Sequence, residues 1–599
     1  MNLLLTKESF ELIGDRTQFT TMLSVKQLED GKTIVHVAFT ATETAIPPSF
    51  TLKWTHPILD IHGFWHPWAD RNKGLQVDWG GGYNSRATTS APVGCLYNIN
   101  GRNRLTYALS DALNPIWFRA GVSEESAMFT CEVKLFAEPM EPLLKYEAEL
   151  LIDTRDVPYY DSLHDVQQWW ANFPYLSPSS VPEIARTPMY STWYSFHQQI
   201  TSEGIEAQCK EAKLLGCETV IVDDGWQTSD NTRGYAYCGD WHVCEDKIPD
   251  MKAHVKRVHQ LGMKYLLWYS VPFIGKHSKA WHLFEDKMLS IDEHLGTGIV
   301  DPRFPEVREY LIQIYEQAII DWNLDGLKLD FVDSFQLTEK GIHDLGRGRD
   351  YVSLPDAVDR LLTDVNLRLR VLKPDIMIEF RQTYVGPLMR KYGNMFRAAD
   401  CPNDCLTNRI RTLDIRLLCG NTAAHSDMLM WNAGESAQSA ALQLLNVLFS
   451  VPQISVTLDT LPEAHHRMVK FWLSLWKEHR DVLLDGYLEP FNPELNYPVV
   501  RSSTTEKRLL AAYHDTVIRP GLQVPAQLIV VNGTLDHYLV MDLAQNLKKY
   551  SLEVRNCLGE VVQTTIPLCW KEGLHKLDIP PAGVAIWTKV EAENNEECY

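Results

Sequence analysis

Two short strings, each an apolar run that ends in charged residues, constrain the fold of this 599-residue chain most strongly. Residues 219–222 lead into Asp223 and Asp224, and residues 326–329 lead into Asp330. Short apolar runs bounded by turn residues are typical of buried parallel strands. A carboxylate placed directly after such a strand is difficult to explain by packing, because a buried charge is costly unless it is paired or used. In a barrel of alternating strands and helices, that end of the strand carries the chemistry.

The middle of the chain, from about residue 185 to 485, alternates between predicted strands and amphipathic stretches. Val307, Leu311, Ile314 and Ala318, for example, recur at helical spacing. Such a strand-then-helix rhythm, repeated eight times, predicts a (β/α)8 TIM barrel. The predicted strands are residues 189–196, 219–223, 264–270, 326–330, 376–380, 395–398, 423–429 and 451–458.

The two flanks of this region have a β-rich pattern. Residues 33–39 and 129–135 alternate between apolar and polar side chains, which indicates an antiparallel N-terminal β-sandwich. Strand-forming sequence returns after residue 486, which indicates a small C-terminal antiparallel β-sandwich. The sequence therefore predicts a multidomain α/β plus all-β protein. Its domains are an N-terminal sandwich at 1–183, a catalytic barrel at 184–486 and a C-terminal sandwich at 487–599.

Composition excludes several classes of partner. The net charge of -20 argues against nucleic acid and against anionic membranes. No run approaches the roughly 20 apolar residues of a membrane span, and the first residues lack the basic segment of a signal peptide, so we expect a cytoplasmic location. The 12 Cys residues are scattered and fit reduced thiols. We expect no metal and no cofactor, and the sequence leaves a homo-oligomer open.

Carboxylates, cations and aromatic rings gather at the predicted carboxyl ends of the barrel strands. Aromatic faces stack on the apolar faces of sugar rings, and carboxylates accept hydrogen bonds from hydroxyl groups, so this mixture favours a small-molecule oligosaccharide as ligand. The residues that we expect at the barrel mouth are Trp193, Asp223, Asp224, Trp268, Lys328, Asp330, Arg381, Asp400 and Asp404.

Two of these carboxylates suit glycoside hydrolysis, which needs a pair of carboxyl groups at one glycosidic bond. Asp330 and Asp400 end the fourth and sixth predicted strands, so both should project into the barrel mouth. Lys328 shares a strand face with Asp330, and its ammonium would keep Asp330 ionised, as a nucleophile requires. The mostly apolar neighbours of Asp400 are expected to raise its pKa and keep it protonated as a general acid.

Ordinary structural roles compete with these functional ones. A single Asp after a strand is more often the N-cap of the next helix, but the consecutive Asp223 and Asp224 exceed what one cap needs. Trp193 and Trp268 either fill the top of the barrel or bind substrate. Trp65, in the string Phe64-Trp65-His66-Pro67-Trp68, either reaches over the barrel mouth to bind substrate or lies at a domain interface.

At these residues the chain resembles the α-galactosidases of the melibiase type, glycoside hydrolase family 36 (GH36), which shares a clan with family 27. The resemblance covers roughly residues 185–485, and the β–barrel–β domain order agrees. The matching strings are Asp223-Asp224-Gly225-Trp226, Gly239-Asp240-Trp241, Gly262-Met263-Lys264 with Leu267-Trp268, Lys328-x-Asp330 and Arg397-Ala398-Ala399-Asp400.

The resemblance implies a retaining double displacement. Asp330 would be the nucleophile and Asp400 the acid/base, while Asp223 and Asp224 would bind the galactose O4 and O6 hydroxyls and Lys328 hydroxyls nearby. The axial O4 distinguishes galactose from glucose, so paired carboxylates there would act as a specificity device.

The chain also departs from the family pattern. Residues 379–383 are Glu-Phe-Arg-Gln-Thr where members often have Cys-Ser-Gly-Gly, which places Arg381 where the O2, O3 and leaving-group contacts would be. Val332 stands where many members have Asn. The spacing Asp400…Asp404…Arg409 is stretched, which leaves Asp404 as an alternative acid/base.

These observations predict a retaining exo-α-galactosidase that releases terminal α-galactose from small oligosaccharides or glycosides. Three alternatives stay open at this point. The chain could be a related retaining α-glycosidase such as an α-N-acetylgalactosaminidase, a transglycosylase that moves galactose to an acceptor sugar, or a non-catalytic carbohydrate-binding protein.

Overall fold

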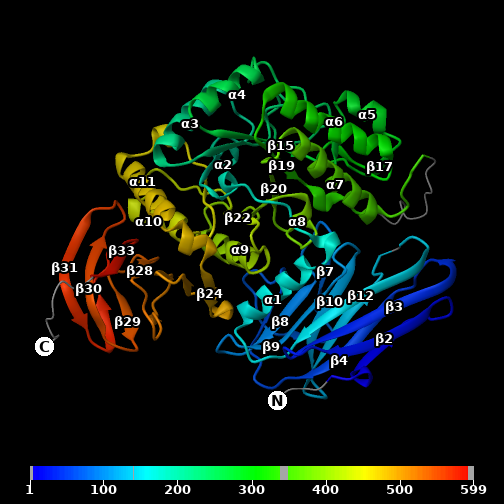
Figure 1. Cartoon of the computed structure of the whole chain (residues 1–599). Helices are drawn as coiled ribbons and strands as arrows, with labels where there is room; N and C mark the ends of the chain where they lie inside the picture. Colours follow the sequence, from blue (N-terminus) through cyan, green and yellow to red (C-terminus); the bar gives the residue numbers. More distant parts are fainter. Residues whose placement is uncertain (1–4, 139, 338–347, 591–599) are drawn as a thin grey trace.

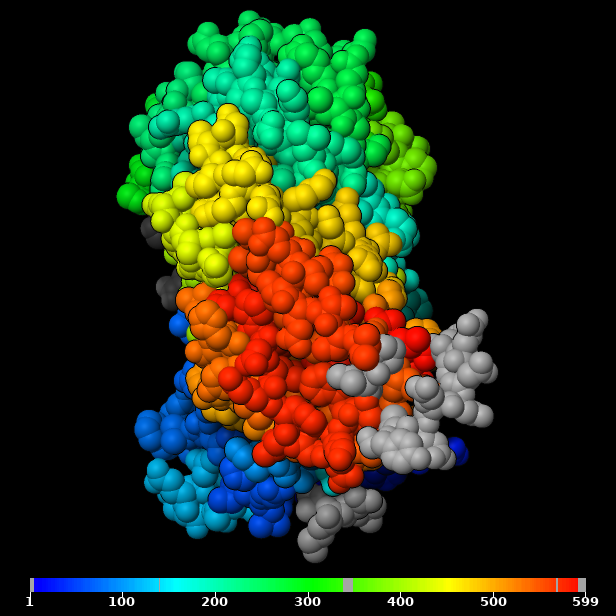
Figure 2. Space-filling view, turned by 90° about the vertical axis from the view of Figure 1, so that its left-hand side faces the viewer, coloured from blue at the N-terminus to red at the C-terminus, as the bar shows by residue number. Residues whose placement is uncertain are grey.

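The computed structural model describes residues 5–138, 140–337 and 348–590 of the chain. A barrel surrounded by helices lies at the top of Figure 1, with the N-terminal sheets at the lower right and the C-terminal sheets at the lower left. Viewed from the side of the C-terminal strands, these strands lie between the barrel above and the N-terminal sheets below (Figure 2). The predicted combination of a barrel with all-β flanks is confirmed. The exact domain boundaries stay predictions.

Two sheets precede the barrel and share one core. Phe39 of β3 and Phe50 of β4 lie in different sheets, and their ring centroids are 4.4 Å apart. One sheet has the order β1 (Phe10–Ile13), β4 (Phe50–Pro57), β11 (Met128–Leu135), β10 (Ile116–Ser123) and β6 (Gln76–Val77), with β7 (Tyr83–Ser85) also paired to β10. The other has the order β2 (Thr20–Gln27), β3 (Lys32–Ala45), β12 (Leu143–Asp153), β9 (Asn103–Leu109), β8 (Val93–Tyr97) and β5 (Gly63–Trp65). Helix α1 (Tyr159–Ala171) then leads to the barrel.

Eight parallel strands form the barrel sheet. Its chain order is β13 (Met189–Ser191), β14 (Thr219–Val222), β15 (Lys264–Ser270), β19 (Gly326–Asp330), β20 (Met377–Arg381), β21 (Met395–Arg397), β22 (Ala423–His425) and β23 (Gln453–Ile454). The spatial order follows the chain order, except that β16, β17 and β18 form a separate small sheet. A parallel bridge from His425 to Val451 nearly closes the ring between β22 and β23. The eight predicted strands are thus all present.

Several of these strands are shorter than the sequence predicts. The first ends at Ser191 instead of residue 196, because the N–H groups of Tyr194 and Ser195 donate to the Ser455 hydroxyl, at 2.9 and 3.2 Å, and the chain turns into the short helix α2 (Trp193–Phe196). The seventh and eighth strands likewise reduce to three and two residues. The chain therefore leaves the barrel sheet early at the mouth, where the site residues lie.

Helices surround the barrel and are capped by residues that the sequence supplies. Asp404, for example, caps α9 by accepting from the Thr407 N–H at 3.0 Å. The helices are α3 (Ser202–Leu215), α4 (Met251–Gln260), α6 (Pro305–Trp322), α7 (Leu354–Leu372), α8 (Met389–Tyr392), α9 (Cys405–Leu418), α10 (Ala437–Leu445) and α11 (Glu463–Glu478). After β15 the chain adds a small unit made of β16 (Phe273–Gly275), α5 (Lys279–Phe284), β17 (Met288–Asp292) and β18 (Thr297–Val300).

The C-terminal part has two further sheets with a common core. Leu510, Leu528 and Trp587 of one sheet are buried with Met541 and Leu577 of the other. The larger sheet has the order β24 (Tyr487–Phe491), β25 (Val499–Ser503), β26 (Lys507–Ala512), β28 (Gln527–Asn532), β33 (Val584–Lys589), β30 (Leu547–Arg555) and β31 (Val561–Trp570). The smaller contains β27 (Val517–Ile518), β29 (Leu539–Leu543) and β32 (Gly573–Leu577). Within the described ranges, no helix has the length and apolar character that crossing a membrane requires.

Candidate active site

Asp330 ends β19 and is held by donors on both carboxylate oxygens. The Arg381 Nε donates to Oδ1 at 2.7 Å, and the Trp268 Nε1 donates to Oδ2 at 3.1 Å. The Tyr384 hydroxyl and the Phe331 N–H also donate to Oδ1, the latter at 2.8 Å. Asp330 is only 6% exposed. A carboxylate with this many donors is fixed in position and kept in its charged form.

The charge of Asp330 depends on two cations. Burial acts to raise the pKa of Asp330, but Arg381, Lys328 and the hydrogen bonds from Tyr384 and Trp268 outweigh it and hold the pKa well below its usual value. Arg381 contributes more than Lys328. The sequence predicted an ionised Asp330 but assigned this effect to Lys328 alone. Arg381 is the cation that forms an ion pair with Asp330. Lys328 shares a strand face with Asp330, yet its ammonium points to another carboxylate.

That other carboxylate is Asp223, which follows β14. The Lys328 Nζ lies 2.5 Å from the Asp223 Oδ2, and both side chains are 4% exposed. Asp224 next to it has different partners: its two oxygens accept from the side-chain amides of Gln198 at 2.6 Å and Gln227 at 2.7 Å. Burial, with a contribution from the charge of Asp223, raises the pKa of Asp224 to about 6. The consecutive Asp pair is therefore buried without acting as a helix cap.

Asp400 follows β21 and has a more open position, with 48% of its side chain exposed. The Arg397 Nη2 donates to its Oδ1 at 2.9 Å, and Arg397 also pairs with Asp427. Desolvation acts to raise the pKa of Asp400, but Arg397, Lys328 and Arg381 outweigh it and lower the pKa. The expectation of a raised pKa for Asp400 was wrong. Its neighbours in sequence are mostly apolar, but the guanidinium of Arg397, three residues earlier in the chain, contacts its carboxylate.

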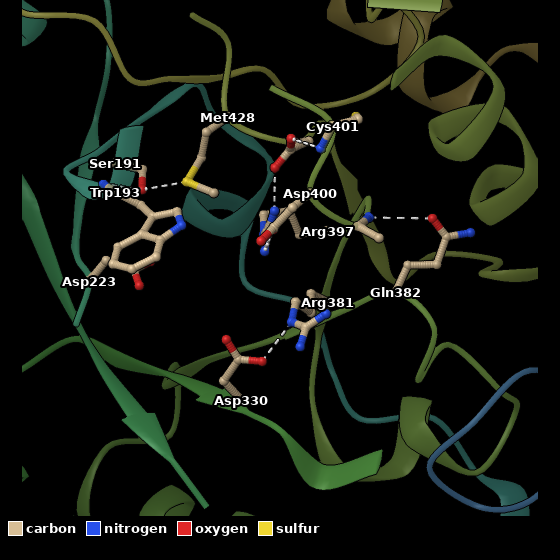
Figure 3. A network of polar contacts seen from close by, with 12 residues as sticks. Ser191, Trp193, Asp223, Asp330, Arg381, Gln382, Arg397, Asp400, Cys401 and Met428 are labelled. Carbon is tan, nitrogen blue, oxygen red and sulfur yellow. Dashed lines mark hydrogen bonds and ion pairs between the residues drawn. The ribbon is translucent and has the colours of Figure 1, made fainter. Parts of the chain in front are cut away.

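The two candidate carboxylates share one electrostatic environment. Arg381 contacts Asp330, and Arg381 and Lys328 both act on the charge of Asp400 as well. Figure 3 shows Asp223, Asp330, Arg381 and Asp400 around a common space at the carboxyl ends of the strands. The structure thus brings together five of the residues that the strand ends predicted, Asp223, Lys328, Asp330, Arg381 and Asp400. Chemically, the space offers a fixed carboxylate, a more exposed carboxylate and acceptors for several hydroxyl groups.

The two tryptophans predicted at the mouth have different positions. Trp193 begins α2, is partly exposed, and lies at this space in front of Asp223 in Figure 3. Trp268 is 1% exposed and is enclosed by other rings, with its indole N–H on Asp330. A buried ring offers no free face for stacking on a sugar. The contact with Asp330 favours a positioning role for Trp268, and substrate binding by Trp268 stays a prediction.

Trp65 does not reach the barrel mouth. Its side chain is completely buried, and its indole N–H donates to the Asp414 carboxylate on α9 at 2.9 Å. The substrate-binding prediction for Trp65 is wrong, and the alternative of an interface between the N-terminal sheets and the barrel holds. Asp404 is the N-cap of α9 and forms an ion pair with Arg71, so both of its oxygens have structural partners. This arrangement weakens Asp404 as the alternative acid/base.

Three residues of the site had no prediction from sequence. Tyr384 lies in the loop after β20, where no periodic pattern identified it. Gln198 lies after α2, far from Asp224 in sequence. Gln227 directly follows the Asp223–Trp226 string, and its amide type next to two carboxylates was a signal that could have been used. In the part of the chain that the structure describes, no three His, Cys, Asp or Glu side chains are grouped so that they could hold a metal ion.

Comparisons with known proteins find related sequences and similar folds. The melibiase family model matches residues 176–355. The chain is 26% identical over 255 residues to the bifunctional α-galactosidase/sucrose kinase AgaSK of Mediterraneibacter gnavus, a match that covers 41% of this chain and 25% of that protein. It is 26% identical over 177 residues to an α-galactosidase of Escherichia coli, covering 28% of this chain and 25% of the relative. The chain thus matches about a quarter of the length of these curated relatives.

Solved structures resemble the chain over nearly its whole length. The GH36 α-galactosidase AgaB from Geobacillus stearothermophilus has a TM-score of 0.64 and 14% identity, covering 97% of this chain and 83% of that one. AgaA from the same organism has a TM-score of 0.64 and 14% identity, covering 96% and 84%. At this identity the likeness supports the fold alone. With the family match, it confirms the resemblance to GH36 α-galactosidases that the sequence motifs predicted.

Proposed function

We propose that this protein is a retaining exo-α-galactosidase that releases terminal α-linked galactose from small oligosaccharides or glycosides. The observation that carries the proposal is the state of Asp330, a buried carboxylate fixed by Arg381, Trp268 and Tyr384 at the end of a barrel strand. Its low pKa provides the charged form that a nucleophile needs. The match to the melibiase family supports the choice of sugar.

In the first step, the Asp330 carboxylate would attack the anomeric carbon and form a covalent galactosyl ester. The glycosidic oxygen leaves with a proton from Asp400, and the charge that develops on the ring is balanced by the new bond. Asp400 must carry that proton, although Arg397 lowers its pKa in the free site. A bound sugar would remove water from this half-exposed carboxyl, which favours its neutral form.

In the second step, water would attack the ester and restore Asp330, with galactose released in its original configuration. Asp400 now has to accept a proton from that water. Its ionised form is the one that Arg397 stabilises, so the free-site geometry is already suited to this half of the reaction. Transfer to a second sugar in place of water would use the same geometry, which is why a transglycosylase stays an outcome of the test.

Selection of galactose would depend on Asp223 and Asp224. Both are buried, and Lys328 and the two glutamine amides hold them in place. A sugar that lacks the axial O4 would leave a buried acceptor without its donor, which is the strongest way in which a polar site rejects an analogue. A variant of AgaA from Geobacillus stearothermophilus has been solved in complex with raffinose, which supports an oligosaccharide as substrate class.

Hydrolysis of three p-nitrophenyl substrates tests this proposal. The α-galactoside, the α-glucoside and the α-N-acetylgalactosaminide are compared in the presence of a chelator, with Asp330→Ala as the control. Turnover of the α-galactoside alone, lost in the variant, is the expected result. Preference for another sugar would refute the specificity, and absence of turnover would favour a carbohydrate-binding protein. Product analysis with an excess of acceptor sugar separates hydrolysis from transfer.

A further inference from the structure

Arg411 connects the backbone of the loop that carries Asp400 to the N-terminal part of the chain. Arg411 lies on α9, and its Nη1 donates to the main-chain carbonyls of Ala399 at 3.2 Å and Asp400 at 3.1 Å. Its Nη2 donates to the Asp70 carboxylate at 2.9 Å. Asp70 belongs to the segment between β5 and β6, so one guanidinium joins the backbone of the candidate acid/base to a different part of the molecule.

Residues 65–73, which we call the strap, hold α9 at further points. Arg71 donates to the Asp404 carboxylate and, at 2.8 Å, to the Thr407 hydroxyl, both at the first turn of α9. Within the strap, the Lys73 Nζ donates to the Asp70 carbonyl at 2.7 Å. This contact ties the position of Asp70 to Lys73. The strap therefore contacts the start of the helix that follows directly after the Asp400 loop.

The strap is anchored at a buried carboxylate further along α9. Asp414 accepts from the Trp65 Nε1 at 2.9 Å and from the Lys73 Nζ at 3.1 Å. The Tyr497 hydroxyl of the C-terminal part donates to the same carboxylate at 2.5 Å. Lys73 and Asp414 have side chains 0% and 5% exposed, so this contact lies away from water, and loss of either partner would leave a buried charge unpaired.

The other side of the Asp400 loop is held from within the barrel. The Arg397 guanidinium contacts the Asp400 carboxylate, and the Cys401 N–H donates to Asp427 at 2.6 Å. Arg397 and Asp427 thus hold the inner side of the loop. Among the residues that the structure describes, Arg411 is the side chain that links the carbonyls of Ala399 and Asp400 to the strap. A general acid must lie within hydrogen-bond reach of the leaving oxygen, so a shift of this backbone would change proton transfer.

We propose that Arg411, held by Asp70 of the strap, is a positioning residue that sets the main chain of Asp400 for proton donation to the leaving group. This inference rests on the proposed function, because it assumes that Asp400 is the acid. It gives the N-terminal sheets a role in the reaction even though Trp65 does not reach the substrate. Arg411 itself acts through the backbone and needs no contact with the sugar.

Leaving-group dependence tests this role. The value of kcat/KM is measured for 2,4-dinitrophenyl α-galactoside, whose leaving group needs little protonation, and for phenyl α-galactoside, whose leaving group needs much. Arg411→Met should lose at least about tenfold more activity on the phenyl substrate than on the dinitrophenyl substrate, a part of the roughly 10²- to 10⁴-fold that general acid catalysis supplies. Asp70→Asn should show the same selective loss to a smaller extent.

Arg416→Met is the matched control. Arg416 lies on the same helix and also donates to backbone carbonyls, those of Phe449, Leu483 and Leu484, but it does not contact the Asp400 loop. It should change both substrates by equal factors, as a purely structural defect does. Equal losses on both substrates in Arg411→Met, or no loss, would overturn the proposal.

Two further outcomes keep the test decisive. If Arg411→Met does not fold, as judged by circular dichroism, Asp70→Asn decides alone, because Asp70 is 39% exposed and its replacement is a small change. Equal factors on both substrates in Asp70→Asn would then overturn the positioning role. A wild-type protein that hydrolyses neither substrate would instead refute the proposed function, and this result is distinct from a wild-type enzyme with an unselective variant.

Discussion

Loss of the buried ion pair between Lys328 and Asp223 should lower the stability of the folded protein by an amount that can be calculated. Lys328→Met would leave the Asp223 carboxylate buried without its cation, and such a group takes up a proton instead of staying charged. Neutralising an aspartate of ordinary acidity costs about 4 kcal/mol at pH 7, since each pH unit above its midpoint adds about 1.4 kcal/mol. This agrees with the ~3–5 kcal/mol found when buried pairs are broken. At pH 5, protonation of the same carboxylate costs only about 1.5 kcal/mol.

The consequence is a loss of stability that becomes smaller as the pH falls. For a domain as large as the barrel, a change of 1 kcal/mol in the free energy of unfolding shifts the melting temperature by about 2 °C. We therefore expect the melting temperature to decrease by about 8 °C at pH 7 and about 3 °C at pH 5. Differential scanning calorimetry of wild-type and variant protein at both pH values measures this difference. The double variant Lys328→Met/Asp223→Asn, which leaves no unpaired charge, should recover most of the lost stability.

A lysine at the opposite end of the barrel strands provides the control. Lys264 pairs with Asp325 at 3.0 Å, but its side chain is 48% exposed, and Asp325 keeps His259 and Lys373 as partners. Lys264→Met should therefore cost less than about 1 kcal/mol. Equal small shifts for the two lysine variants, or a shift for Lys328→Met that does not decrease at pH 5, would refute the reasoning about the buried pair.

Three further predictions concern the site. Trp268→Phe keeps an aromatic ring but removes the 3.1 Å hydrogen bond to Asp330, so kcat should fall about tenfold or more with KM little changed; a raised KM with kcat unchanged would indicate substrate stacking instead. Asp404→Asn keeps a good N-cap and loses only an exposed ion pair, so it should cost less than about 1 kcal/mol of stability and leave turnover within a few-fold, whereas Asp400→Asn should abolish turnover of phenyl α-galactoside; the reverse order would make Asp404 the acid. Galactose should bind roughly tenfold more weakly at pH 5 than at pH 7.5, because protonation of Asp224 near its pKa of about 6 removes an acceptor; an affinity by calorimetry that does not change with pH would contradict this.

The sequence predicted the architecture because strand periodicity and strand-end charge are local signals. All eight barrel strands were found, and Asp223, Asp330 and Asp400 do meet at one mouth. The partner of Lys328 was not predictable from spacing along its own strand. In such barrels, alternate strands contribute the side chains of one interior layer, and β14 and β19 are alternate strands, so Lys328 meets Asp223 across the barrel.

The errors at Trp65 and Asp400 have a similar physical origin. Trp65 contacts Asp414, a residue 349 positions away, and no local pattern reports where the N-terminal sheets pack on the barrel. The apolar neighbours of Asp400 in sequence are not its neighbours in space, because the Arg397 guanidinium reaches it from the strand end. Burial and charge at a site therefore depend on residues that the tertiary fold supplies, whereas the strand ends themselves depend on local sequence.

Covalent labelling tests whether Asp330 is the nucleophile. The protein is incubated with 2,4-dinitrophenyl 2-deoxy-2,2-difluoro-α-galactoside, whose activated leaving group allows the ester to form while the fluorines slow its hydrolysis. Peptide mass spectrometry then locates the attached sugar. We expect one fluorinated galactosyl group per chain, on Asp330. A sugar attached to a different carboxylate, or a protein that hydrolyses α-galactosides with inversion and acquires no label, would contradict it.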